Sequence, residues 1–159
     1  MANAEHLFEL NKGAESWNRW RADNKKVIPD LQNADLSYHD LRWYNLGGID
    51  FYGIKPVNLK GANLSYANIS EAVLSEANLM GANMAYVTII NSQCKDTNVK
   101  GSNLTGGNLT NSGFYGANMM EANFTNCDCT NVVFVNANIR NAVFSNTITT
   151  GADFTGATT

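Results

Sequence analysis

Apolar side chains recur at every fifth position between residues 59 and 154. Nineteen of these twenty positions are apolar, and the exception is Thr149. Two residues before each of them stands a small or narrow side chain, most often alanine. A period of five fits neither the 3.6 residues of a helical turn nor the two-residue alternation of a strand. The backbone must therefore turn a corner every five residues and bring the same two positions inward each time, which predicts a solenoid.

Several repeats share one signature, a small residue followed by asparagine or aspartate and then by a large apolar residue. Examples are Ala34-Asp35-Leu36, Ala62-Asn63-Leu64, Ala77-Asn78-Leu79 and Ala82-Asn83-Met84. Over residues 29–158 the chain resembles the pentapeptide-repeat family, and residues 14–21 resemble the amphipathic leader of small members from photosynthetic bacteria. The resemblance implies an all-β solenoid, a right-handed quadrilateral β-helix of about six coils with four pentapeptides in each.

The first 28 residues are expected to form a capping helix and a linker, and residues 29–159 the β-helix. The spacing predicts one helix over residues 4–23, with an apolar stripe that closes the open end of the solenoid. The cap residues are Leu7, Leu10, Trp17 and Trp20. A partner-binding or membrane-surface helix is the rival interpretation, but its polar face mixes acidic with basic residues and is not basic enough for a membrane surface.

One interruption breaks the five-residue count. The step from Phe51 to Leu59 is eight residues, within a stretch that holds three glycines and Pro56. We therefore expect a bulged loop near residues 47–57. Just before it, the positions usually occupied by alanine carry His39, Tyr44 and Ile49, which predicts an irregular first coil that receives the tryptophans of the cap.

At 20 residues per coil, equivalent inward positions stack at the spacing of hydrogen-bonded strands, about 4.7–4.9 Å. The expected core moves from aliphatic to aromatic toward the C-terminus, with Phe114, Phe134 and Phe154 in one continuous stack. The inward positions singled out as structural core are Leu64, Leu79, Leu104, Phe114, Phe124, Phe134, Phe144 and Phe154.

The sequence contains no motif for catalysis, for a metal or for a cofactor. The glycines recur at multiples of five and mark turns, and His6 and His39 have no nucleophile signature beside them. Cys94, Cys127 and Cys129 are interpreted as buried reduced thiols, since a zinc site normally has four ligands. No signal peptide or membrane span is read, so a cytoplasmic, non-enzymatic protein without cofactors is expected.

Three functions compete. The first is a protein-interaction or regulatory module with a rigid surface and an unknown partner. The candidate surface is one outward column, Lys60, Met80, Lys100, Met120 and Arg140, which alternates cations with adaptable side chains. The bland alternative is that this column is merely solvated.

The second function comes from the family resemblance, whose members include DNA mimics that modulate DNA gyrase. This chain differs from them in its length, in its formal net charge of only −3 and in lacking a C-terminal extension. The third is a structural protein without a dedicated partner. Neither direct nucleic-acid binding nor membrane binding is expected. The uncovered last coil, with Phe154 on its face, predicts a weak end-to-end homodimer.

Overall fold

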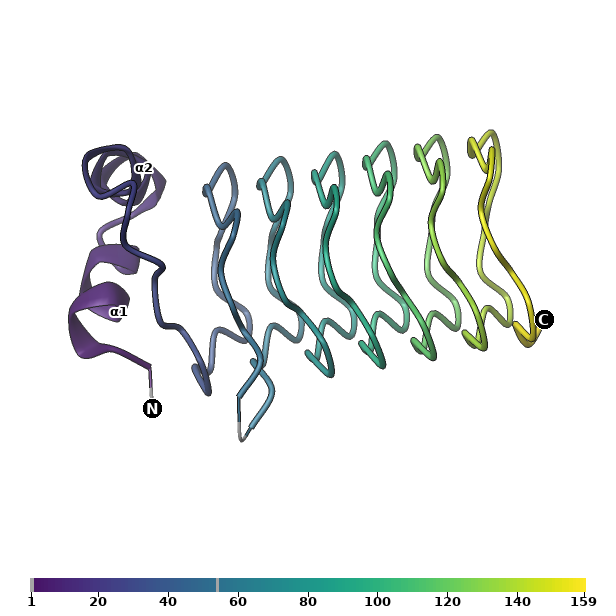
Figure 1. Cartoon of the computed structure of the whole chain (residues 1–159), viewed down its shortest axis with the longest axis horizontal. Helices are drawn as coiled ribbons and strands as arrows, with labels where there is room; N and C mark the ends of the chain where they lie inside the picture. The colour runs from purple at the N-terminus through teal and green to yellow at the C-terminus, as the bar shows by residue number, and fades with distance from the viewer. Residues whose placement is uncertain (1, 54) are drawn as a thin grey trace.

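Two short helices lie at one end of a stack of coils in the computed structural model, which describes residues 2–53 and 55–159 (Figure 1). Helix α1 spans Ala4–Leu10 and helix α2 spans Ala14–Asp23. The remaining chain winds away from them coil after coil, and the C-terminus lies at the far end of the stack. The solenoid with a helical cap that the five-residue period predicts is confirmed.

Parallel β-bridges hold each coil to the next. From Asn58 onward every bridge joins residues 20 positions apart, and the column Asn58, Asn78, Asn98, Asn118 and Asn138 shows the register. Bridges along all four sides link six successive coils, and Thr158 begins a further layer. Because four pentapeptides complete one coil, each side of the coil contributes one repeat.

The first coil is three residues longer than the others. Asp35 pairs with Asn58 and Asp50 pairs with Val73, both at a separation of 23. The register is thus kept on either side of the extra residues, which lie between Phe51 and Val57. The loop expected near residues 47–57 is therefore narrower, because residues 47–50 form an ordinary repeat. Residue 54 lies outside the described residues.

A tight turn forms each corner. Leu59, for example, accepts a hydrogen bond of 3.0 Å from the backbone N–H of Ala62, and Gly61 between them has a φ of 64°. A positive φ at the third residue is the mark of a type II turn. At other corners asparagine, aspartate, glutamate or an aromatic residue adopts the same conformation. Asparagine is abundant at these positions because it tolerates the left-handed region better than most residues.

The core runs along the axis of the solenoid. The side chains of Leu64, Leu79, Leu104, Phe114, Phe124 and Phe134 are buried, whereas those of Phe144 and Phe154 in the last coil are partly buried. Phe134 stacks on Phe114 at 6.1 Å and on Phe154 at 4.8 Å between ring centroids. The homodimer expected through the last coil stays a prediction.

Buried hydroxyl groups occupy several of the alanine-like positions in the middle coils. Ser102 donates to the carbonyl of Leu79 at 2.6 Å, and Thr97 donates to the carbonyls of Leu74 and Cys94. The acceptors Leu79 and Leu74 are inward residues one coil earlier. Since a buried hydroxyl is costly only when it lacks a partner, these positions accept serine and threonine as well as alanine.

The cap consists of two helices, which corrects the single helix expected over residues 4–23. Gly13 separates them with a φ of 99°, a value that a helix interior does not allow. Asn3 caps α1, because its side-chain oxygen accepts from the backbone N–H groups of Glu5 and His6. The break lets α1 and α2 lie against each other instead of forming one long rod.

Candidate interaction surfaces

The cap is tied to the first coil by buried polar contacts as well as by apolar packing. The indole N–H of Trp17 donates to the carbonyl of Asn45 at 2.7 Å, and the hydroxyl of Tyr44 donates to the carbonyl of Leu10 at 2.9 Å. Leu10 and Trp17 are fully buried, and Leu7 and Trp20 pack partly buried beside them. A large residue is therefore needed at Tyr44, because it reaches the cap where alanine would not.

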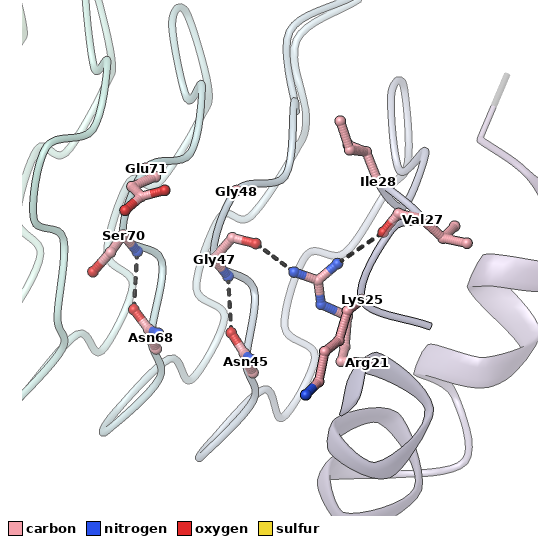
Figure 2. Close-up of a pocket in the computed structure, with 10 residues that line it drawn as sticks. All are labelled: Arg21, Lys25, Val27, Ile28, Asn45, Gly47, Gly48, Asn68, Ser70 and Glu71. Carbon is pink, nitrogen blue, oxygen red and sulfur yellow. Dashed lines mark hydrogen bonds between the residues drawn. The ribbon is translucent and has the colours of Figure 1, made fainter. Parts of the chain in front are cut away.

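Arg21 forms a further link, which Figure 2 shows. Its two terminal guanidinium nitrogens donate to the carbonyls of Gly47 at 2.6 Å and Val27 at 3.4 Å. Its Nε atom is buried without a partner, and burial lowers the pKa of the guanidinium. Among the described residues no carboxylate lies within ion-pair distance of Arg21. The guanidinium therefore works as a clamp between α2, the linker and the first coil.

A cleft of about 450 Å³ opens beside this clamp. Its lining combines polar groups of the first two coils with the exposed side chains of Val27 and Ile28. Because both terminal nitrogens of Arg21 already donate to carbonyls, the cleft offers an arriving anion no cation that is free of other contacts except Lys25 at its edge.

The column of Lys60, Met80, Lys100, Met120 and Arg140 lies along one edge of the solenoid in consecutive coils. Its register is held by backbone bonds, such as those from Gly61 to the carbonyl of Met80 and from Gly81 to that of Lys100, both 2.9 Å. Four of its members are half-buried and Arg140 is exposed. Within the described residues none of its three cations forms an ion pair.

A second outward column is aromatic, and the sequence reasoning missed it. The rings of Trp43 and Tyr66 stack at 4.2 Å with 8° between their planes, and Tyr86 continues the stack at 5.0 Å and 10°. All three are exposed, by 61%, 45% and 53%. We call Trp43, Tyr66 and Tyr86 the aromatic column. Each stands at a corner with positive φ, so the backbone turn aims each ring outward.

The signal for this column was present in the spacing. Tyr66 and Tyr86 are 20 residues apart, and Trp43 precedes Tyr66 by the 23 residues of the longer first coil. The three rings align only when the three extra residues are placed after Phe51, which a uniform 20-residue count does not do.

The aromatic column is closed at one end by Gly106. A Cβ atom at Gly106 would lie 2.6 Å from the Tyr86 ring, so this ring rests directly on the glycine backbone. At the other end lies a cleft of about 380 Å³, lined by Gly13, Ala14, Asp40, Arg42, Trp43 and Tyr44.

An ion pair stands at the rim of this second cleft. Arg42 donates to Asp40 through Nε at 2.8 Å and through a terminal nitrogen at 2.6 Å. The hydrogen bonds from Arg42 hold the pKa of the Asp40 carboxyl below its usual range. Both side chains are more than half exposed, so the pair contributes little to stability, but it makes the rim electrically neutral.

An amide ladder runs along another edge. Asn111 donates to Asn91 at 3.2 Å, and Asn131 donates to Asn111 at 3.1 Å. Because these amides satisfy one another from coil to coil, they explain the asparagine content structurally and leave fewer free groups for recognition.

Groups that could support catalysis or bind a metal ion are dispersed. The described part of the chain contains no cluster of three or more histidine, cysteine, aspartate or glutamate side chains suited to a metal ion. Cys94, Cys127 and Cys129 are buried free thiols, and burial raises the pKa of Cys94. His6 accepts a hydrogen bond from the backbone of Asp30, 24 residues along the chain. Within the described residues, neither helix is long and apolar enough to cross a membrane.

Comparison with known proteins places the fold. A family model described as pentapeptide repeats matches in eight copies, over residues 58–92, 92–128 and 117–156. A search of curated proteins gives no match.

Solved structures of similar fold come from several sources. QnrB1, a plasmid-mediated fluoroquinolone resistance protein, is 20% identical, with 78% of this chain and 76% of that chain covered and a TM-score of 0.51. The pentapeptide repeat protein Rfr23 from the cyanobacterium Cyanothece 51142 is also 20% identical, with 91% and 99% covered and a TM-score of 0.45. A pentapeptide repeat protein from the thylakoid lumen of Arabidopsis thaliana is 20% identical, with 60% and 68% covered and a TM-score of 0.47.

At this identity the likeness concerns the fold alone. The family model, however, spans more than half of the chain, and it agrees with the coil register seen in the structure. The chain belongs to the pentapeptide repeat family, and its coils form the right-handed, four-sided β-helix of that family.

Proposed function

We propose that this protein is a non-enzymatic interaction module that binds a protein partner through the aromatic column. The observation that carries the proposal is the exposure of Trp43, Tyr66 and Tyr86 in one fixed stack on the outside of the solenoid. Large apolar rings gathered on a surface mark interaction sites. Tryptophan, tyrosine and arginine are also the residues that dominate binding energy at interfaces, and Arg42 adjoins the column.

Preorganisation supports this role. The rings already stack on one another, and the backbone beneath them is bonded from coil to coil. A partner therefore does not have to immobilise them on binding, which lowers the entropic cost of association. The side chains beside the column in the same coils are small or neutral, as at Ser65 and Ala85, so the rings stand above their surroundings.

The column of Lys60, Met80, Lys100, Met120 and Arg140 is the rival surface. Its cations lie two coils apart and carry no ion pairs among the described residues, so they are available to an acidic partner. The two columns make different demands on a partner, and variants can separate them.

The test is quantitative affinity capture from an extract of the source organism with four forms of the protein. These are the unmodified chain, a Tyr66→Ser/Tyr86→Ser variant, a Tyr115→Ser control and a Lys60→Glu/Lys100→Glu/Arg140→Glu variant. Tyr115 is a matched control because it is 45% exposed, like Tyr66, but lies outside the aromatic column. We expect a saturable partner to be lost only with the double tyrosine variant.

Loss of the partner only in the charge-reversed form would assign binding to the lysine and methionine column instead. The alternative of a DNA-mimicking gyrase modulator requires a run of negative charge along one face. The aromatic column is uncharged and the rival column is cationic, so we expect the protein to leave gyrase supercoiling unchanged at micromolar concentration.

A further inference from the structure

The aromatic column is closed at one end and open at the other. Tyr86 rests on the backbone of Gly106, which leaves no room for another ring there. Trp43 has one ring face covered by Tyr66 at 4.2 Å, yet 61% of the residue is exposed. Since one face is covered, this exposure belongs to the opposite face and the edges of the indole.

The open face of Trp43 borders the cleft between the first coil and the linker of the two helices. The stack continues along the solenoid axis, where successive layers are about 4.7–4.9 Å apart. In the layer beyond Trp43 the chain has left the β-helix, and Gly13 and Ala14 form the opposite wall of the cleft. The volume of about 380 Å³ lies within the range of small-ligand sites.

The walls favour a neutral planar group over an ion. Gly13 and Ala14 contribute no charge, and the charges of Asp40 and Arg42 neutralise each other at the rim. A cation on the Trp43 face would have to compete with Arg42 for the carboxylate, and an anion would meet a guanidinium that is already paired.

We infer that the open face of Trp43 is a binding site for an aromatic side chain of a protein partner, which adds the next ring to the stack. The inference rests on the proposed function, since it names one group that the partner presents. Aromatic pairs in offset stacking are favoured beyond the area they bury. An aromatic probe should therefore bind about 2- to 10-fold more tightly than an aliphatic probe of the same backbone.

The experiment is an NMR titration of the full chain with three probes, N-acetyl-tryptophanamide, N-acetyl-leucinamide and N-acetyl-argininamide. We expect the tryptophan probe to shift the signals of Trp43 and Ala14 with a millimolar Kd and to give intermolecular NOEs to both residues. The other two should bind at least about 2-fold more weakly. Tighter binding of the arginine probe would replace the inference with a cation site, and equal binding of all three, or no binding, would overturn it.

Variants provide the controls. Trp43→Ser should abolish the shifts, whereas Tyr86→Ser, at the closed end of the column, should retain them. If Trp43→Ser does not fold, the NOEs from the bound probe to Trp43 and Ala14 in the unmodified chain decide the question. Failure of the probes while the Tyr66→Ser/Tyr86→Ser variant still loses its partner would reject this inference alone. Retention of the partner by that variant would reject the proposed function.

Discussion

The first and fifth coils share one backbone plan but fill their interior in opposite ways. In residues 117–136 the inward positions carry large side chains such as Phe124 and Phe134, and the companion positions are small. In the first coil the inward residues are mostly leucine, and volume comes from Tyr44 and Ile49 at the companion positions. The difference shows that the fold requires a constant filled cross-section and leaves open which of the two positions supplies it.

The two regions also differ outside. Of the residues after position 96, only Lys100, Glu121, Asp128, Arg140 and Asp153 are charged, and the rest of the charge lies toward the N-terminus. The aromatic column and both larger clefts lie in the N-terminal part as well. The regular coils therefore act as a rigid support, and the irregular end carries the features suited to recognition.

The sharpest break of this comparison is to remove the cap by deleting residues 1–23. Leu10 and Trp17 leave the core of the first coil, and the contacts of Trp17, Arg21 and Tyr44 across the junction are lost. The loss should exceed the about 3–5 kcal/mol of one large-to-small core substitution. Urea unfolding by circular dichroism would measure it, and sedimentation should show association through the uncovered coil. A monomer with an unchanged midpoint would contradict the role of the cap.

In the fifth coil, Phe134→Ala should cost about 3–5 kcal/mol. Phe134 is fully buried and lies in the middle of two ring columns, with Phe144 at 6.0 Å and Phe154 at 4.8 Å. The surrounding rings are held by the coil backbone and cannot close the cavity. Chemical denaturation would measure the change, and Phe134→Leu, which retains most of the volume, should lose less than half as much.

The regular coils were predictable from the sequence because their spacing encodes the register directly. A five-residue period and an eight-residue step suffice to place the inward positions and the three extra residues. The cap was less predictable, since the apolar stripe of residues 4–23 continues past Gly13 and hides the break between the helices. The aromatic column required the 23-residue offset of the first coil. The partner is not encoded in any pattern of the chain itself, because recognition depends on a second molecule.

The outer corner column changes from aromatic to amide at Gly106, and this boundary can be tested. Gly106 and Gly101 both have a positive φ, 70° and 65°, but only Gly106 has an aromatic ring on it. Gly101→Ala should cost about 1 kcal/mol for the left-handed conformation alone. Gly106→Ala should cost about 1–2 kcal/mol more, because the new Cβ displaces Tyr86. Equal unfolding free energies for the two variants would mean that Tyr86 does not rest on Gly106.

A smaller effect separates the first coil from its regular counterparts. Tyr44→Phe removes the hydroxyl that donates to the carbonyl of Leu10 but leaves the ring in place. Because that carbonyl also accepts from the backbone of Gly13, it keeps a partner, and the loss should be about 1 kcal/mol. Thermal unfolding would measure it, and hydrogen exchange should show the increase in opening within the helices before it appears in the coils.

The smallest expected effect tests the register of the regular coils. Thr130 follows the inward Cys129 and lies on the outer side, where its hydroxyl donates to Asp128 at 2.6 Å. The neighbouring backbone N–H of Thr130 donates to the same carboxylate at 3.0 Å, so Asp128 keeps a partner in Thr130→Ala. The change should stay within about 0.5 kcal/mol, as for most surface substitutions. It forms a pair with Phe134→Ala, four positions further along the chain. Similar losses of unfolding free energy in both variants would require Thr130 to face inward, and would shift every outward column of this coil, including the amide ladder at Asn131.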